Sequence, residues 1–158
     1  MRFVNTRELN FPQKIAIREL WNKEYPVKLR LETFNDLENY LSELEDPHHI
    51  LLIDADKELK GWYVDFSRED ERWFAMILNS ELQGKGLGSK LLKMAMDRET
   101  ELNGWVIDHE KDLKQNGKPY RSPIAFYLKN GFEILPDNRL ELDKISAVRI
   151  RFRKLEEQ

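Results

Sequence analysis

Residues 73–92 decide the fold of this chain, and they read WFAMILNSELQGKGLGSKLL. The apolar run 73–78 predicts a buried strand, and the short polar joint 79–82 follows it. The segment 83–88 then places three glycines within five residues, ahead of a sequence that is compatible with a helix. Glycine has no Cβ, so the backbone of this segment is able to bend sharply and to approach a ligand closely.

A strand, a glycine-rich turn and a helix in this order are typical of an anion-binding site. The free N–H groups of the first helical turn point at one place, and the positive end of the helix dipole lies behind them. A phosphate or pyrophosphate is the ligand that suits such a place. The stretch therefore predicts a pyrophosphate-binding turn, and a glycine-rich turn without a ligand is the alternative.

The glycine spacing distinguishes between kinds of phosphate-binding turn. A P-loop requires Gly-x4-Gly-Lys-Ser/Thr, which this stretch does not supply, and a dinucleotide fingerprint requires a glycine where the chain has Ser89 or Leu91. The pattern that fits is Gln/Arg-x-x-Gly-x-Gly/Ala, which Gln83, Gly86 and Gly88 complete. In this respect the turn resembles the acyl-CoA pyrophosphate loop of the GNAT superfamily of N-acetyltransferases.

Length and composition limit the classes of protein to which the chain can belong. Its 158 residues suit a single domain, 1–158, and the 41% of hydrophobic residues can form a core. The net charge of -3 argues against a nucleic-acid-binding protein. With no cysteine, and with His48 and His49 distant in sequence from His109, we expect no metal site. No apolar segment has the length of a signal peptide or a membrane span, so we expect a cytoplasmic protein that does not bind membranes.

Hydrophobic spacing and turn residues predict an alternation of helices and strands. Helices are expected at 13–24, at 34–44 behind a capping box of Thr33 and Asp36, from 87 to about 102, and at 123–129. Asn103-Gly104 is interpreted as the stop of the third helix, Ser122 as the N-cap of the fourth, and Asn130-Gly131 as the left-handed cap that ends it. Strands are expected at 50–53, 62–66, 73–79, 105–107, 132–135 and 148–152, with a turn at 136–138. The segment 27–31 is interpreted as a short strand or an extended connector, and 108–120 as a long loop.

A second informative stretch, 125–132, reads AFYLKNGF. It resembles the Phe/Leu-Tyr-x-x-x-Gly-Phe signature that follows the glycine-rich loop in GNAT enzymes, across one helix and one strand. The chain departs from the family pattern ahead of Tyr127, because Tyr120 stands where Asn is frequent and Pro123 where Ala is frequent. The usual contact of that Asn with the CoA backbone is therefore in question, and Ser122 or Tyr120 are its candidate substitutes.

The resemblance implies the fold class α+β, a three-layer α/β arrangement in a single GNAT-like domain. Its mixed central sheet is expected to splay between two parallel strands, 73–79 and 105–108, with helices on both faces. The resemblance also implies that acetyl-CoA lies in the gap between these strands and that its pantetheine amides pair with the free edge near 76–78. Loop 108–120 is longer than the common family form, so we expect substrate specificity to reside there.

The residues of the cofactor site are implied by the same resemblance. Those expected to contact acetyl-CoA are Ile77, Leu78, Gln83, Gly84, Lys85, Gly86, Leu87, Gly88, Ser89, Ser122 and Lys129. A backbone N–H near Leu78 is expected to hold the thioester oxygen as negative charge develops on it. Tyr127 is implied to be the catalytic acid for the leaving thiolate. A thiol of pKa ~8.5 leaves readily by itself, so we expect the help from Tyr127 to be modest.

The acceptor is expected to be a small primary amine that attacks the thioester directly. A lysine-like amine of pKa ~10.4 must first lose a proton, which costs roughly 4.6 kcal/mol at pH 7. A base or a chain of water molecules should assist, and the sequence leaves four candidate bases open, which are Asp65, Glu71, Asp108 and His109.

Two other interpretations of the sequence remain. A non-catalytic acyl-CoA-binding or regulatory module on the same fold would bind CoA without releasing it from acetyl-CoA. A plain interaction domain would bind no CoA at all. GNAT proteins often form homodimers, and the identity of the amine and the oligomeric state are not encoded in any motif of this chain.

Overall fold

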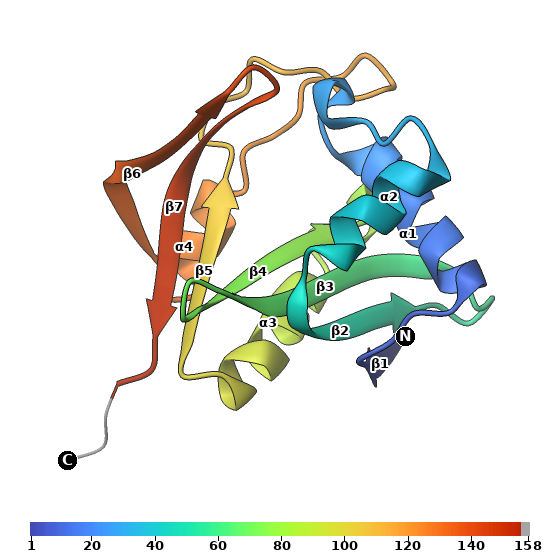
Figure 1. Cartoon of the computed structure of the whole chain (residues 1–158), viewed down its shortest axis with the longest axis horizontal. Helices are drawn as coiled ribbons and strands as arrows, with labels where there is room; N and C mark the ends of the chain where they lie inside the picture. Colours follow the sequence, from blue (N-terminus) through green and yellow to red (C-terminus); the bar gives the residue numbers. More distant parts are fainter. Residues whose placement is uncertain (156–158) are drawn as a thin grey trace.

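The computed structural model describes residues 1–155 and forms one β-sheet with helices on both of its faces (Figure 1). The sheet has the strand order β1-β2-β3-β4-β5-β7-β6. Its strands are β1 (Arg2–Thr6), β2 (Glu45–Ile53), β3 (Leu59–Arg68), β4 (Glu71–Leu78), β5 (Glu101–Val106), β6 (Glu133–Leu142) and β7 (Ile145–Arg153). The helices are α1 (Phe11–Glu24), α2 (Phe34–Ser42), α3 (Leu87–Arg98) and α4 (Ile124–Lys129), with 3-10 turns η1 (Val27–Leu29) and η2 (Ser80–Leu82). No helix among these residues is long and apolar enough to cross a membrane.

The sheet splays between β4 and β5, which form its parallel pair. The two strands pair at one position, Trp73 with Asn103, which lies near the start of both strands. Figure 1 shows the two strands running apart toward their carboxyl ends. On its other side β4 pairs with β3 in an antiparallel ladder that extends to Leu78. The predicted mixed sheet, splayed between two parallel strands, is therefore confirmed.

Alternate residues of β4 supply two cores, because successive side chains of a strand point to opposite faces of the sheet. Trp73 and Ile77 belong to the core beneath α1 and α2. Phe74 belongs to the core on the other face, with Leu91 and Leu92 of α3. The apolar run that predicted a buried strand thus serves both faces, and it fixes β4 at the centre of the fold.

The helices α1 and α2, which cover one face of the sheet, both begin at a capping box. At α1 the side chain of Asn10 accepts a hydrogen bond from the backbone N–H of Gln13, and the side chain of Gln13 accepts one from the N–H of Asn10, each at 2.9 Å. Thr33 and Asp36 exchange the same two bonds at the start of α2. The predicted box is confirmed, with Asp in the place that Glu or Gln usually takes.

The predicted end of α3 is wrong by about one turn. The helix ends at Arg98, and Leu102 is buried in β5. Asn103 and Gly104, which were interpreted as a helix stop, lie in the middle of that strand. Glycine is required at position 104 by packing, because a Cβ there would approach the ring of Phe74 to 2.8 Å. A glycine beside an asparagine therefore marks a close contact here and not a turn.

We expect Gly104→Ala to lower the free energy of unfolding by about 1–3 kcal/mol, because the added methyl overpacks the buried ring of Phe74. Chemical denaturation measures this loss. Adding Phe74→Leu to the variant should recover part of the loss, since it removes the ring that the methyl meets. A single variant as stable as the parent would contradict the close contact.

Other parts of the chain also differ from the sequence predictions. The segment 27–31, interpreted as a strand or connector, contains the 3-10 turn η1, whose Leu29 carbonyl accepts a hydrogen bond from the Trp21 indole at 2.8 Å. The short polar strand β1 was not predicted. The turn expected at 136–138 is a bulge within β6, and the chain reverses later, between Leu142 and Ile145.

Candidate active site

The glycine-rich turn joins the end of β4 to α3 and leaves backbone amides free. Gly84 and Gly86 have φ angles of 78° and 76°, in the left-handed region that other residues rarely adopt. Gly86 is the N-cap of α3, and no side chain caps the first N–H groups of this helix. Unsatisfied N–H groups and the positive end of the helix dipole are what an anion requires. The geometry of the turn therefore suits a phosphate group.

Gly88 brings the two sequence motifs together. A Cβ at this position would lie 3.3 Å from the ring of Phe126 and 3.4 Å from Leu78. Glycine thus allows the first turn of α3 to lie against α4 and the end of β4. The glycine-rich turn and the stretch 125–132, which are far apart in the sequence, meet at this contact.

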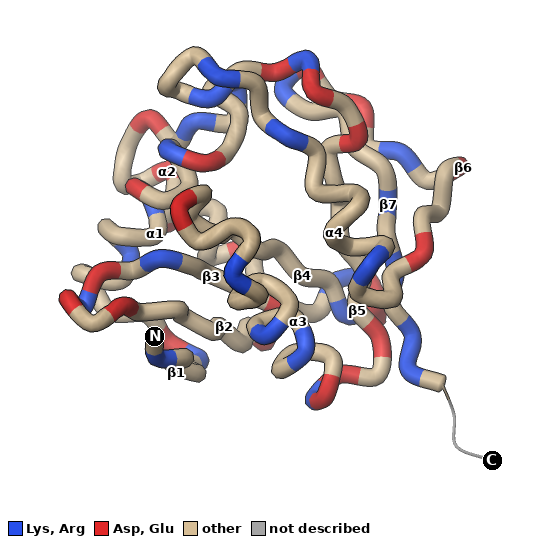
Figure 2. The backbone as a smooth tube through the Cα atoms, turned by 180° about the vertical axis from the view of Figure 1, so that it is seen from behind, with Lys and Arg blue, Asp and Glu red and all other residues tan. Residues whose placement is uncertain are grey.

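A cleft of about 1200 Å³ lies beside the carboxyl end of β4. Six segments border it: the end of β4, η2, the glycine-rich turn, α4, loop 108–120 and the end of α1. Figure 2, seen from behind, shows α3 and α4 in front of the sheet, with lysines, arginines and acidic residues interspersed along the chain. The residues predicted for the site that line this cleft are Ile77, Leu78, Gln83, Gly84, Gly86, Gly88, Ser89, Ser122, Tyr127 and Lys129. Lys85 and Leu87 belong to the same turn but are not part of its lining.

Tyr127 lines the cleft from α4, and its ring is buried to all but 5% of its surface. The ring packs against Phe74, Phe126 and Phe132, with centroids 5.1 to 5.7 Å apart. Burial is the main cause that raises the pKa of Tyr127 above its ordinary value. The hydroxyl therefore keeps its proton at neutral pH and is available to donate it, but it is a weaker acid than a solvated tyrosine.

Ser122 and Lys129 lie at the two ends of α4. The hydroxyl of Ser122 donates a hydrogen bond to the carbonyl of Ile107 at 2.6 Å and accepts one from the N–H of Ile124 at 3.4 Å. It therefore ties the end of β5 to the start of α4. The N-cap of α4 is Pro123, one residue later than predicted. At the other end, Gly131 has the left-handed φ of 90° that the sequence predicts for the helix stop.

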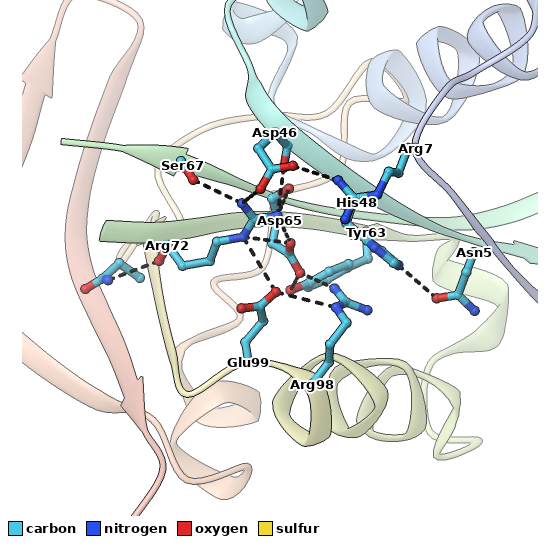
Figure 3. A network of polar contacts seen from close by, with 11 residues as sticks. Asn5, Arg7, Asp46, His48, Tyr63, Asp65, Ser67, Arg72, Arg98 and Glu99 are labelled. Carbon is cyan, nitrogen blue, oxygen red and sulfur yellow. Dashed lines mark hydrogen bonds and ion pairs between the residues drawn. The ribbon is translucent and has the colours of Figure 1, made fainter. Parts of the chain in front are cut away.

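The candidate base Asp65 lies outside the cleft in a buried polar network (Figure 3). Its carboxylate accepts hydrogen bonds from the guanidinium groups of Arg72 and Arg98 and from the hydroxyl of Tyr63, the last at 2.7 Å. Burial, followed by the charge of Asp65, raises the pKa of Tyr63, so this hydroxyl remains a donor. Arg72 is the second residue of β4, and Arg98 ends α3 at the opposite end of that helix from the glycine-rich turn. Asp65 is therefore a structural ion-pair centre.

The other three candidate bases are also outside the lining of the cleft. Glu71 pairs with Arg149 at 2.7 Å. Asp108 accepts two hydrogen bonds from Arg139 at 2.8 and 3.0 Å, and the guanidinium lowers the pKa of this carboxyl. The Nδ1 atom of His109 accepts a hydrogen bond from a backbone N–H within the loop. The structure therefore places none of the four candidates beside the predicted thioester position.

Sequence reasoning missed Glu24, the last residue of α1, which lines the cleft and is 7% exposed. Its Oε2 atom accepts a hydrogen bond from the backbone N–H of Ser80 at 2.9 Å. Its Oε1 atom lies 3.0 Å from the Nζ of Lys114. No motif could have selected this glutamate, because its surroundings come from two segments that are remote in sequence.

Loop 108–120 forms an ordered wall of the cleft. Figure 1 shows it, coloured orange, reaching from the end of β5 toward α1. The carbonyl of Leu113 accepts a hydrogen bond from the N–H of Val27 at 2.8 Å, and Lys28 pairs with Asp112 at 2.9 Å. Tyr120, at its end, lines the cleft together with Tyr25, and burial raises the pKa of Tyr120 to about 12. Among residues 1–155, no group of three or more potential metal ligands is arranged to hold an ion.

A family model described as "Acetyltransferase (GNAT) domain" matches residues 46–134 of the chain. The match includes both the glycine-rich turn and the stretch 125–132. No curated protein sequence matches the chain. The family model therefore carries the sequence relationship, and it spans the part of the fold that forms most of the cleft.

Solved structures share the whole fold at low sequence identity. An aminoglycoside 6'-N-acetyltransferase complexed with coenzyme A superposes with a TM-score of 0.72 at 12% identity, over 100% of this chain and 99% of that one. An acyl-CoA N-acyltransferase from Pseudomonas aeruginosa gives a TM-score of 0.68 at 15% identity, over 96% and 99%. A mutant of the spermidine N-acetyltransferase SpeG from Vibrio cholerae gives 0.64 at 19% identity, over 97% and 95%. At these low identities, the comparison shows that the folds are alike and nothing more.

Proposed function

The chain belongs to the GNAT acetyltransferase family, and from this premise we propose that it is an acetyl-CoA-dependent enzyme that transfers the acetyl group to a primary amine by direct attack. The observation that carries the proposal is the uncapped, left-handed glycine turn at the border of the large cleft. A turn of this kind suits the pyrophosphate of CoA. The structural neighbour that was solved with coenzyme A has the same fold.

The free edge of β4 suits the pantetheine arm. β4 pairs with β5 only at Trp73, whereas Met76, Ile77 and Leu78, farther along β4, line the cleft. Backbone groups on the side of β4 that faces away from β3 are therefore available to the amides of a ligand, which would add to the sheet as a further strand does. This placement brings the thioester near Leu78, where a backbone N–H would hold its oxygen as negative charge develops.

Tyr127 is the proposed proton donor to the leaving thiolate. The remaining cofactor residues act through backbone and charge: Gln83, Gly84, Lys85, Gly86, Leu87, Gly88 and Ser89 around the pyrophosphate, with Ser122 and Lys129 at the two ends of α4. No metal takes part in the proposed reaction. The amine, after it has given up its extra proton to a base or to water, forms the new bond from its nitrogen to the acetyl carbon, and the carbon–sulfur bond breaks as the thiolate leaves.

We expect Tyr127→Phe to lower kcat by about tenfold, less than the hundredfold or more that general acids often supply, because burial makes this hydroxyl a weak acid. The measurement is the steady-state rate at saturating acetyl-CoA, with the dissociation constant of CoA as a second readout that should not change. Tyr40→Phe is the matched control, since burial also raises the pKa of Tyr40, to about 12, and its ring packs against the core beneath α1 and α2, away from the cleft. An unchanged kcat in Tyr127→Phe would remove its role as the acid.

The proposed function is tested by release of free CoA from acetyl-CoA in the presence of amines. The panel contains alkylamines, polyamines, amino acids, aminoglycosides and a lysine peptide, and a thiol reagent detects the CoA. Amine-dependent release supports the enzyme. CoA binding without release for any amine would favour the alternative, a non-catalytic acyl-CoA-binding module, and absence of CoA binding would exclude both.

A further inference from the structure

A buried ion pair inside the cleft has no role in cofactor binding as proposed above. The Nζ of Lys114 lies 3.0 Å from the Oε1 of Glu24, and the two side chains are 15% and 7% exposed. Both residues line the cleft. A carboxylate this deeply buried requires a cationic partner, because an unpaired buried charge is strongly unfavourable. In the structure that partner is the primary ammonium group of the chain itself.

The position of Glu24 is fixed with respect to the end of β4. Its second carboxylate oxygen accepts the 2.9 Å hydrogen bond from the N–H of Ser80, the first residue of η2. Ser80 follows Leu78 by two residues, and the thioester is proposed to lie near Leu78. The ammonium of Lys114 is thus separated from the acyl-transfer end of β4 by a single carboxylate group.

The surroundings of the ion pair suit a primary ammonium on an alkyl arm. Tyr25 and Tyr120 line the same cleft, and their ring centroids lie 6.4 Å apart. Aromatic faces favour cations and also pack against methylene groups. Lys114 itself is a four-carbon alkylammonium, so the protein shows directly which chemistry its cleft accommodates.

Lys114 is able to leave without unfolding of the loop that carries it. The loop is anchored by its backbone: the N–H of Lys114 donates to the carbonyl of Lys118, and the carbonyl of Leu113 accepts from the N–H of Val27. The side chain of Lys114 is therefore attached to a fixed wall by a flexible stem. An incoming ammonium would replace one buried charge pair by another of the same kind, and the displaced Nζ would return to water.

We infer that Glu24 is the ammonium-binding residue of the acceptor site and that Lys114 is an internal competitor which occupies this site until a small primary alkylamine displaces it. The inference rests on the proposed function, because it names the acceptor chemistry of the same cleft. Glu24 lines the cleft, which none of the four sequence-predicted bases does.

The test measures binding of n-butylamine, which carries the alkyl arm and ammonium of a lysine side chain, to the protein without CoA by isothermal titration calorimetry. Lys114→Met keeps an apolar stem that is one atom shorter, so it vacates the place of the ammonium. We expect it to tighten n-butylamine binding by about tenfold, because a competitor that masks the site lowers apparent affinity in proportion to the time it occupies it. Glu24→Gln, whose amide oxygen still accepts the Ser80 N–H, should abolish the binding.

Four comparisons make the result specific. The double variant should behave as Glu24→Gln does, because Lys114 acts only through Glu24. Lys111→Met, on the same loop, and Glu19→Gln, on the same helix, change charge outside the lining of the cleft and should leave the affinity unchanged. The neutral n-butanol should not bind to any of the proteins. In turnover, Lys114→Met should lower the KM for the amine and leave kcat nearly constant.

Thermal unfolding supplies a second readout. Lys114→Met leaves the buried carboxylate without its partner, so its Tm should fall, and n-butylamine should restore the Tm because a ligand that binds only the folded state stabilises it. If Lys114→Met binds n-butylamine no more tightly than the parent, the pair is only a structural link between α1 and the loop, and the inference is overturned. CoA titrations of the same proteins test the proposed function separately, since the amine affinities are measured in the absence of CoA.

Discussion

Gly86→Asp should weaken acetyl-CoA binding by at least about two orders of magnitude, which corresponds to roughly 2.8 kcal/mol. The substitution brings a carboxylate to the N-cap of α3, where the proposed pyrophosphate requires the free N–H groups and the positive end of the dipole. An aspartate at the N-cap also accepts hydrogen bonds from these same N–H groups, so it competes with the ligand in geometry as well as in charge. Calorimetric titration of acetyl-CoA measures the loss.

Two variants separate the contribution of charge from that of backbone conformation. Gly86→Asn has the same shape as Gly86→Asp and no charge, and Asn tolerates the left-handed conformation about as well as Asp does. It should lose clearly less affinity. Gly117→Asp places the same residue at a φ of 80° in loop 108–120, outside the lining of the cleft, and should bind acetyl-CoA normally. Equal losses in Gly86→Asp and Gly86→Asn would mean that charge at the turn does not govern binding.

The central part of the fold was predictable because its signals are local. The apolar run 73–78, the glycines of the turn and the helical spacing after residue 87 each act within a few residues, and the structure has β4, the turn and α3 in that order. The failures have equally physical causes. Gly104 was interpreted as a helix stop because the sequence does not show the ring of Phe74 that excludes a side chain there.

The residues of the candidate site show the same difference between local signals and contacts with remote segments. Residues that act through their own turn or helix, such as Gly86 and Tyr127, were selected from motifs, and they line the cleft. Residues that act through remote partners were not selected, and Glu24 is the clearest case, because Ser80 and Lys114 reach it from other segments. Asp65, one of the four candidate bases, shows the converse error: an acidic residue near a strand end had partners that the sequence could not reveal.

Asp65→Asn should be among the most destabilising single substitutions in the protein. Asp65 is fully buried, and its carboxylate joins β3 to Arg72 of β4 and to Arg98 in the last turn of α3. Without the Asp65 charge, and among the described residues, Arg72 keeps only its longer pairs with Asp46 and Glu99, and Arg98 keeps only its pair with Glu99. Removing one partner of a buried ion pair typically costs about 3–5 kcal/mol. For a chain of this size that loss corresponds to a fall in Tm of roughly 10 °C. Thermal and chemical denaturation measure both quantities.

The network also predicts which part of the protein Asp65→Asn should destabilise locally. Amide hydrogen exchange should increase near Arg98, at the end of α3, while acetyl-CoA affinity measured well below the Tm should stay constant, because the glycine-rich turn lies at the other end of that helix. Asp70→Asn removes the same charge from the exposed tip between β3 and β4 and should have little effect on stability. Adding Arg98→Met to Asp65→Asn should recover part of the loss by removing one cation that has lost its buried partner. If Asp65→Asn were as stable as the parent, the two arginines would have to be satisfied by water, and the network could not be what holds α3 against the sheet.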